Sequence, residues 1–101
     1  MLEYNESADF AHHEREVTDF IGTIDRLGIS VAADATVLDL GAGHGMHAGF
    51  LCEHFAHVHC ADIIDYSALY GGEFLKLLNE KHERNGRAID LPKISFLKTD
   101  A

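Results

Sequence analysis

The sequence predicts an α/β fold built on a parallel β-sheet. Short apolar segments of strand type alternate with amphipathic segments of helix type, in the order helix, strand, helix, strand, helix, strand. Glycines directly follow the first strand segment and lead into a helical segment, as in parallel sheets whose crossovers are helices. Such crossovers are right-handed, so we expect neighbouring strands with helices packed on the faces of the sheet.

The first helix is predicted over residues 7–27. Residues 30–35 are small or polar and form a connection to the first strand, residues 36–40, which ends at Gly41. The apolar residues of the helix recur at spacings of three and four and share one face, which we expect to be the buried one: Val17, Phe20, Ile21, Ile24 and Leu27.

A second helix and a second strand follow the glycines. The helix is predicted over residues 46–55, and the strand over residues 58–61 ends before Asp62. Three apolar side chains of this helix are expected to face the sheet: Phe50, Leu51 and Phe55.

The last helix and strand are predicted over residues 74–84 and 94–98. Asn85-Gly86 is a typical helix stop, and three side chains of the helix are expected to point inward: Phe74, Leu77 and Leu78. The sequence ends where the third strand would end. We therefore expect residues 1–101 to form a single domain that is incomplete at its C-terminus.

Acidic residues dominate the charge of the chain. Its 17 Asp and Glu stand against 8 Lys and Arg, which gives a net charge of −9 at pH 7. Such a surface repels nucleic-acid phosphates and anionic membrane headgroups, so neither is an expected partner. No apolar run approaches the length of a membrane span, and the first residues lack a signal-peptide pattern. These features favour a cytoplasmic protein.

Histidines and cysteines gather between residues 52 and 60. His54, His57 and His59 lie between Cys52 and Cys60, without the paired spacings of zinc sites. His57 and His59 alternate along the second strand and share a face that Cys60 does not. The sequence therefore predicts no metal site, and both cysteines are expected to be small buried apolar residues.

The stretch Asp39-Leu40-Gly41-Ala42-Gly43-His44-Gly45 carries the functional signal. Glycines between a strand and a helix allow a sharp turn and let a ligand approach the main chain. The dinucleotide pattern G-x-G-x-x-G/A fits only when it starts at Gly43 and ends at Ala48, which places Asp39 near an anionic pyrophosphate. The two negative charges would repel each other. S-adenosylmethionine carries a sulfonium, an ammonium and one carboxylate, so its net charge is positive and Asp39 would not repel it.

The same stretch resembles motif I of class I methyltransferases, a Rossmann-like family that uses S-adenosyl-L-methionine. An acid followed by three alternating glycines carries the resemblance, which extends over residues 36–101. It implies a three-layer Rossmann-like sandwich, of which this chain is the N-terminal cofactor-binding half. It also implies that the methionine part of the cofactor is held by the loop: Asp39, Gly41, Ala42, Gly43, His44 and Gly45.

Two acids at later strand ends agree with this resemblance. Asp62 follows the second strand, where a carboxylate can accept hydrogen bonds from both ribose hydroxyls. The resemblance implies that Asp62 binds the ribose and that the adjacent Ile63 also contacts the cofactor. It implies as well that Asp100 reaches the adenine and that the backbone of Ala101 lines the adenine pocket. Asp62 could instead cap the next helix, although Asp65 is better placed for that role.

The expected activity is methyl transfer from S-adenosylmethionine to an acceptor that the sequence does not identify, with a small molecule favoured. Such a transfer is an in-line displacement that depends on alignment of donor and acceptor, so no residue is assigned as catalytic. Two alternatives stay open: an NAD(P)-binding oxidoreductase domain that uses Gly43, Gly45 and Ala48, and a non-catalytic methyltransferase-like support domain. A homo-oligomer also stays open, because a three-stranded half leaves an exposed sheet edge.

Overall fold

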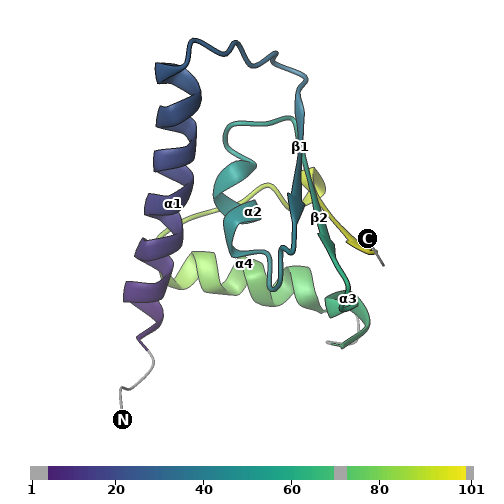
Figure 1. The fold of residues 1–101 in the computed structure, drawn as a ribbon. Helices are drawn as coiled ribbons and strands as arrows, with labels where there is room; N and C mark the ends of the chain where they lie inside the picture. Colours follow the sequence, from purple (N-terminus) through teal and green to yellow (C-terminus); the bar gives the residue numbers. More distant parts are fainter. Residues whose placement is uncertain (1–4, 70–72, 100–101) are drawn as a thin grey trace.

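Three parallel strands and the helices that connect them form the chain in the computed structural model (Figure 1). The structure describes residues 5–69 and 73–99. In chain order the elements are α1 (Glu6–Arg26), β1 (Thr36–Leu40), α2 (Met46–Leu51), β2 (His57–Asp62), α3 (Tyr66–Leu69), α4 (Phe74–Arg84), the 3-10 turn η1 (Leu91–Lys93) and β3 (Ile94–Lys98).

The sheet has the order β1-β2-β3 with both pairs parallel. Leu40 of β1 lies beside Ala61 of β2, which lies beside Leu97 of β3. The carboxyl ends of all three strands therefore meet at one edge of the sheet, where open α/β folds bind ligands. The predicted α/β fold with a parallel sheet is confirmed.

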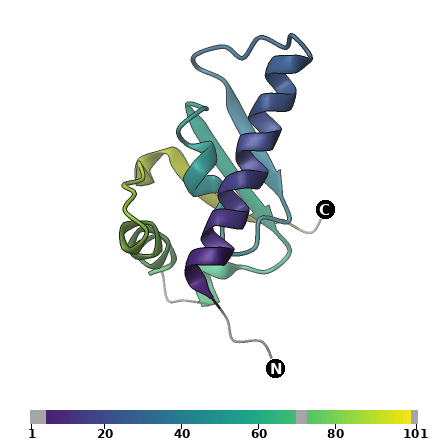
Figure 2. The same cartoon turned by 90° about the vertical axis from the view of Figure 1, so that its left-hand side faces the viewer.

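The helices cover one face of the sheet. Helix α2 packs on β2, α1 packs on α2, and α4 packs on α2; Figures 1 and 2 show these three helices on the same side of the strands. Both right-handed crossovers run in the same direction across the sheet, and this places α2 and α4 on the same face. The described part of the chain thus has two layers, the sheet and the helices on one of its faces. A third layer on the other face, as in the predicted sandwich, is not seen in the described residues.

Apolar side chains occupy the opposite face of the sheet as well. Leu38, Leu40 and Leu97 are 55%, 68% and 61% exposed on this open face. His59 is also exposed there, and its ring lies 4.4 Å from that of His57. His57 and His59 therefore share a face, as the alternation along the strand predicted.

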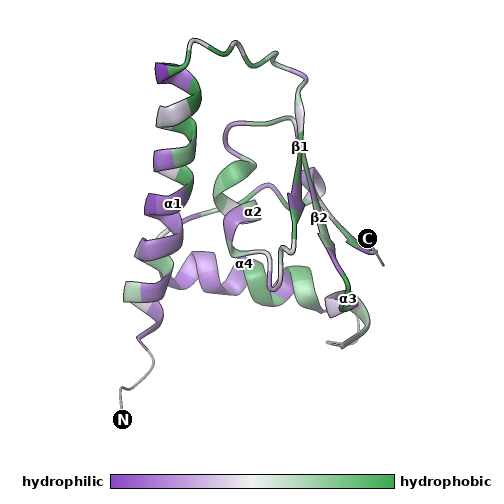
Figure 3. Ribbon diagram, in the orientation of Figure 1, coloured by the Kyte–Doolittle hydropathy of each residue, from purple (hydrophilic) through white to green (hydrophobic). Residues whose placement is uncertain are grey.

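The core lies between the sheet and α2. Val58 and Cys60 of β2 point into it, and Figure 3 shows the apolar half of α4 lying nearest to the sheet. Cys52 and Cys60 are buried free thiols, as expected, and burial, followed by the nearby charge of Asp39, raises the pKa of Cys60 to about 12. The wider cluster of buried residues is Phe10, Val17, Met46, Ala48, Phe50, Leu51, Cys52, Phe55, Val58, Cys60, Leu78 and Ile94.

Several predicted details of the helices were wrong. Phe20 and Leu27 are 46% and 68% exposed, because α1 has 21 residues and packs on α2, which has only 6. Leu77 is 43% exposed, since the buried face of α4 runs instead through Phe74, Leu78 and His82, four residues apart.

The second helix is shorter than predicted. It ends at Leu51, although Phe50, Leu51 and Phe55 are all buried, as expected. The strand β2 also includes His57 and Asp62, and the short helix α3 and the turn η1 were not predicted. None of the helices in the described ranges is both long enough and apolar enough to span a membrane.

Candidate functional site

The glycine loop, residues 41–45, joins the carboxyl end of β1 to α2. Gly41, Gly43 and Gly45 all have positive φ angles, of 70°, 55° and 72°, a region that side chains with a Cβ rarely adopt. A Cβ at Gly41 or Gly43 would meet no atom within 4 Å, whereas one at Gly45 would lie 2.8 Å from the ring of Phe96. Gly45 is thus required for packing, and the other two leave main chain open to a ligand.

Backbone hydrogen bonds fix the glycine loop on the central strand. The N–H groups of Gly41 and Ala42 both donate to the carbonyl oxygen of Ala61, at 2.8 and 3.1 Å. The N–H of Gly43 donates to Oδ2 of Asp62 at 3.0 Å. The loop is therefore held by the carboxyl end of β2, and not only by the strand from which it emerges.

Asp62 organises the turn after β2. Its Oδ1 accepts a hydrogen bond from the N–H of Ile64 at 3.0 Å, and the bonds from Ile64 and Gly43 lower the pKa of its carboxyl group. The helix that follows is capped by Asp65, whose Oδ1 accepts from the N–H of Ala68 at 3.0 Å. Asp65 is the helix cap, as anticipated, and Asp62 is not. Each carboxylate oxygen of Asp62 keeps a second lone pair for another donor.

Asp39 lies two residues before the loop, on the helix-covered face of β1. Its Oδ2 is buried and has no hydrogen-bond partner among residues 5–69 and 73–99. Burial raises the pKa of this carboxyl group, and the positive charge of a protonated His47 opposes that shift. Asp39 lines a cavity of about 310 Å³ together with Glu16 and His47.

His44 extends from the glycine loop towards α3 and α4. Its ring meets Tyr66 edge-on, with the ring centroids 4.9 Å apart, and stacks at 6.3 Å on Phe74. Phe74 in turn packs against Phe96 of β3 at 4.3 Å. The loop side chain is therefore part of an aromatic contact that links three elements at the carboxyl edge of the sheet.

Of the cavities that adjoin the glycine loop, two differ greatly in size. The larger, of about 600 Å³, lies between α1, the loop and α4, and its wall includes Gly41, Ala42 and Lys81. The smaller, between Asp62 and the end of β3, has a volume of only about 10 Å³, and Tyr66 of α3 is among the residues that line it. Space near Asp62 suffices for about one water molecule.

The structure places most of the predicted contact residues at one edge of the sheet. The loop residues, Asp62 and the 64% exposed Ile63 lie there together. Asp39 lies on the helix-covered face and lines another cavity, together with His47, which also lines the large cavity beside the loop. Asp100 and Ala101 lie outside the described residues.

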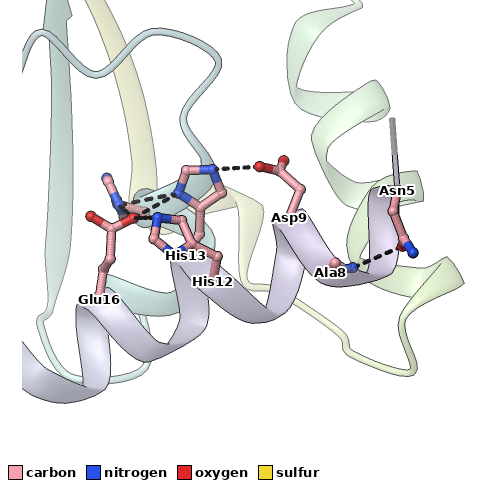
Figure 4. A network of polar contacts seen from close by, with 7 residues as sticks. Asn5, Ala8, Asp9, His12, His13 and Glu16 are labelled. Atoms are coloured by element: carbon pink, nitrogen blue, oxygen red, sulfur yellow. Dashed lines mark hydrogen bonds and ion pairs between the residues drawn. The ribbon is translucent and has the colours of Figure 1, made fainter. Parts of the chain in front are cut away.

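A second polar cluster, which the sequence did not reveal, joins α1 to α2. His13 Nδ1 lies 3.3 Å from His47 Nε2 and 3.3 Å from Glu16 Oε1, and Figure 4 shows the α1 members of this network side by side. Burial raises the pKa of Glu16, but the hydrogen bond from His47 and the nearby histidines outweigh it and lower that pKa overall. The weak signal in the sequence was the i, i+3 pair of His13 and Glu16, and nothing local connects that pair to His47.

No protein-family model, curated protein sequence or solved structure matches the chain.

Proposed function

We propose that the chain is the S-adenosylmethionine-binding half of a Rossmann-like methyltransferase, which transfers a methyl group to a small-molecule acceptor. One observation carries the proposal: a loop with three positive-φ glycines leaves the carboxyl end of β1 and is tied by Gly43 to the carboxylate of Asp62 at the end of β2. A loop of this form exposes main-chain groups to a ligand that lies across both strand ends.

The cavity of about 600 Å³ beside the loop suits the amino-acid end of the cofactor. Gly41, Ala42 and Lys81 are among the residues that line it. A lysine ammonium complements the α-carboxylate of the methionine part, and the acidic character of the whole chain favours a ligand of net positive charge.

Asp62 would hold the ribose through the lone pairs that Gly43 and Ile64 leave free. The space beside it is only about 10 Å³, so an adenosine enters only if Tyr66 and α3 move outward. Ile63 follows at an exposed position and would contact the nucleoside from the solvent side, and Asp100 with Ala101 would complete the adenine end.

Asp39 favours a cationic ligand over a dinucleotide. Its Oδ2 is buried and has no hydrogen-bond partner in the part of the chain that the structure describes, so ionisation carries a desolvation cost, and a pyrophosphate nearby would increase that cost. A sulfonium or ammonium would offset it. This is the physical reason to prefer S-adenosylmethionine over NAD(P) for the same glycine loop.

The reaction requires that the chain hold and orient the methyl donor. The acceptor nucleophile displaces the sulfur from the methyl carbon in line, and the thioether S-adenosylhomocysteine leaves. Alignment supplies most of the catalysis in such a step, so the glycine loop and Asp62 act as positioning groups.

The test is calorimetric titration of the chain with S-adenosylhomocysteine, and separately with NAD. We expect saturable binding of the first only, weakened about tenfold or more by Asp62→Ala and by Gly43→Ala, which forces a Cβ into a positive-φ position. Asp34→Ala, an exposed acid in the connection between α1 and β1, is the matched control and should leave affinity unchanged.

Three results would contradict the proposal. Binding of NAD alone would assign the loop to an oxidoreductase domain. Equal affinity in the Asp62→Ala and Asp34→Ala variants would remove Asp62 from the site. A chain that is folded by circular dichroism and binds neither ligand would be a support domain without cofactor.

A further inference from the structure

Three metal-ligating atoms converge between α1 and α2. They are Nδ1 of His13, Oε1 of Glu16 and Nε2 of His47, and all three lie within 4.8 Å of one another. Their separations are 3.3 Å between the two imidazoles, 3.3 Å from His13 to Glu16 and 3.5 Å from His47 to Glu16. Two consecutive turns of α1 supply the first pair of side chains (Figure 4), and the second residue of α2 supplies the third.

These distances match the edges of a zinc coordination tetrahedron. Zinc–nitrogen and zinc–oxygen bonds of about 2.0–2.2 Å at tetrahedral angles separate the ligand atoms by about 3.3–3.6 Å. Adjacent ligands of an octahedral ion at the same bond length would be only about 3.0 Å apart. The spacing of the three atoms therefore fits a four-coordinate zinc ion. A larger octahedral ion such as Ca²⁺, with longer bonds, would give a similar spacing, but the two imidazole ligands argue against it.

Hydrogen bonding alone explains the cluster less well. Bonds between a charged imidazole and a carboxylate are typically about 2.7–2.9 Å long, shorter than the contacts that His13 and His47 make with Glu16. His12, which lies outside the cluster, reaches the same oxygen of Glu16 at 3.0 Å. The cluster atoms thus converge on a common point without forming tight pairs.

The surroundings of His13 fit a metal ligand. Oδ1 of Asp9 lies 3.4 Å from Nε2 of His13, on the side of the ring away from the cluster. A carboxylate on that side electrostatically favours the tautomer with the proton on Nε2, which leaves the lone pair of Nδ1 on the cluster side, as in many metal-bound histidines. Asp9 and Glu16 also bring two carboxylates to the site, and these attract a cation.

We propose that His13, Glu16 and His47 form a Zn²⁺ site with one open coordination position, and that Asp9 positions His13. Imidazole ligands select zinc over magnesium or calcium, and a site with two histidines and one glutamate leaves the fourth position to water. His13 and His47 both line the cavity of about 600 Å³ beside the glycine loop, so the open position can face that cavity. The three ligands lie outside the glycine loop, so zinc binding can be measured without a cofactor.

The test is calorimetric titration of the metal-free full chain with zinc chloride, without any other ligand. We expect one Zn²⁺ per chain. Removal of a ligand in His13→Ala or His47→Gln should weaken binding by about 100-fold, and Asp9→Asn by about tenfold. His54→Ala removes an exposed histidine outside the cluster, and its affinity should equal that of the parent chain.

Cobalt(II) provides a second measurement on the same protein. A four-coordinate Co²⁺ ion absorbs visible light far more strongly than a six-coordinate one, and we expect the strong spectrum, lost in His47→Gln. His13 and His47 are 24% and 33% exposed, so their replacement should leave the far-ultraviolet circular dichroism unchanged.

Several outcomes would overturn the site. The first is that the chain binds no zinc, and the second is that a folded His47→Gln variant keeps the zinc affinity of the parent chain. The third is that His54→Ala loses as much zinc affinity as the ligand variants, and the fourth is a weak cobalt spectrum typical of a six-coordinate ion. Should His13→Ala fail to fold, Glu16→Gln, which changes an exposed side chain, takes its place with the same expected loss.

Discussion

The imidazole of His82 occupies the space into which a Cβ of Gly49 would project. The ring is fully buried between α4 and α2, and it packs against Phe10 and Phe50 with ring centroids 4.9 and 5.0 Å away. A glycine in the middle of α2 therefore allows a histidine of α4 to approach the helix backbone. This contact fixes the distance between the two crossover helices.

Replacement of Gly49 by alanine should destabilise the protein. Alanine favours a helix by about 1 kcal/mol, but the clash with His82 should cost more, for a net loss of about 1–3 kcal/mol in the free energy of unfolding. Gly22→Ala is the matched control, since its Cβ meets only the flexible side chain of Arg26 at 3.4 Å, and it should stabilise α1. Urea denaturation followed by circular dichroism measures both. Equal effects of the two variants would contradict the close approach.

His82 should make stability fall as the pH is lowered. Burial, with help from the charges of Arg87 and Lys81, lowers the pKa of His82 from 6.5 to about 4. Between pH 6.5 and pH 4, His82 binds a proton in the unfolded chain but not in the folded chain. The contribution of His82 to the free energy of unfolding is therefore fully present above pH 6.5 and decreases as the pH falls towards 4. The loss attributable to this group approaches about 3 kcal/mol.

The comparison of the parent chain with His82→Leu isolates this effect. Neither ring nitrogen of His82 has a hydrogen-bond partner within the described ranges, so leucine removes a desolvated polar group and should be tolerated at pH 7. Denaturation midpoints measured from pH 7 to pH 4 should fall less steeply in the variant. Parallel curves would show that His82 does not titrate in this range.

The strands could be predicted from the sequence because their signals are local. Short apolar segments and the glycines after the first one gave three parallel strands in the correct places, and Asp65 was recognised as a cap. The position of His82 could not be predicted in the same way. A histidine in a charged helix resembles a surface residue, and its burial depends on the space at Gly49, thirty-three residues earlier.

The two candidate sites also differ in whether local sequence patterns could predict them. The glycine loop and Asp62 lie at strand ends, so sequence position alone brings them together in a parallel sheet. His13, Glu16 and His47 meet only because α1 packs across α2, a tertiary contact that no local pattern encodes. His57 and His59, from the histidine-rich stretch between Cys52 and Cys60, lie on the open face of the sheet instead.

Asp39→Asn should raise stability and lower cofactor affinity. Burial raises the pKa of Asp39, so its ionised form is unfavourable in the folded chain. The resulting loss of stability grows as the pH rises above the ordinary pKa of an aspartate. The neutral amide should add about 1 kcal/mol to the free energy of unfolding at pH 7. Calorimetry with S-adenosylhomocysteine should show weaker binding by the same variant, and unchanged affinity would remove Asp39 from the proposed site.

Arg87 should contribute more to stability than the neighbouring Arg84. Its guanidinium group bonds Glu14 at 3.0 Å, pairs with Glu53 and lies 4.6 Å above the ring of Phe50, with its side chain only 20% exposed. Arg87→Ala should cost about 2 kcal/mol in urea denaturation. Arg84→Ala removes an exposed ion pair with Glu6 and should cost much less, so a reversed order would be contrary evidence.

Substitutions on the open face of the sheet should be tolerated. Leu38→Lys and Leu97→Lys replace side chains that are more than half exposed, and each should change stability by no more than about 0.5 kcal/mol. Val58→Ala, on the covered face of the central strand, should cost about 2 kcal/mol. Thermal denaturation distinguishes the two faces, and a large loss in either lysine variant would mean that the open face is packed.

The backbone of α2 links the glycine loop to the cluster of His13, Glu16 and His47. It has six residues, begins after Gly45 of the loop and carries His47 as its second residue. A ligand that shifts the glycine loop therefore moves an imidazole of the histidine cluster, and an ion held by that imidazole restrains the loop. Thermodynamic linkage then makes the effect mutual: the factor by which one ligand changes the affinity of the other is the same in both directions.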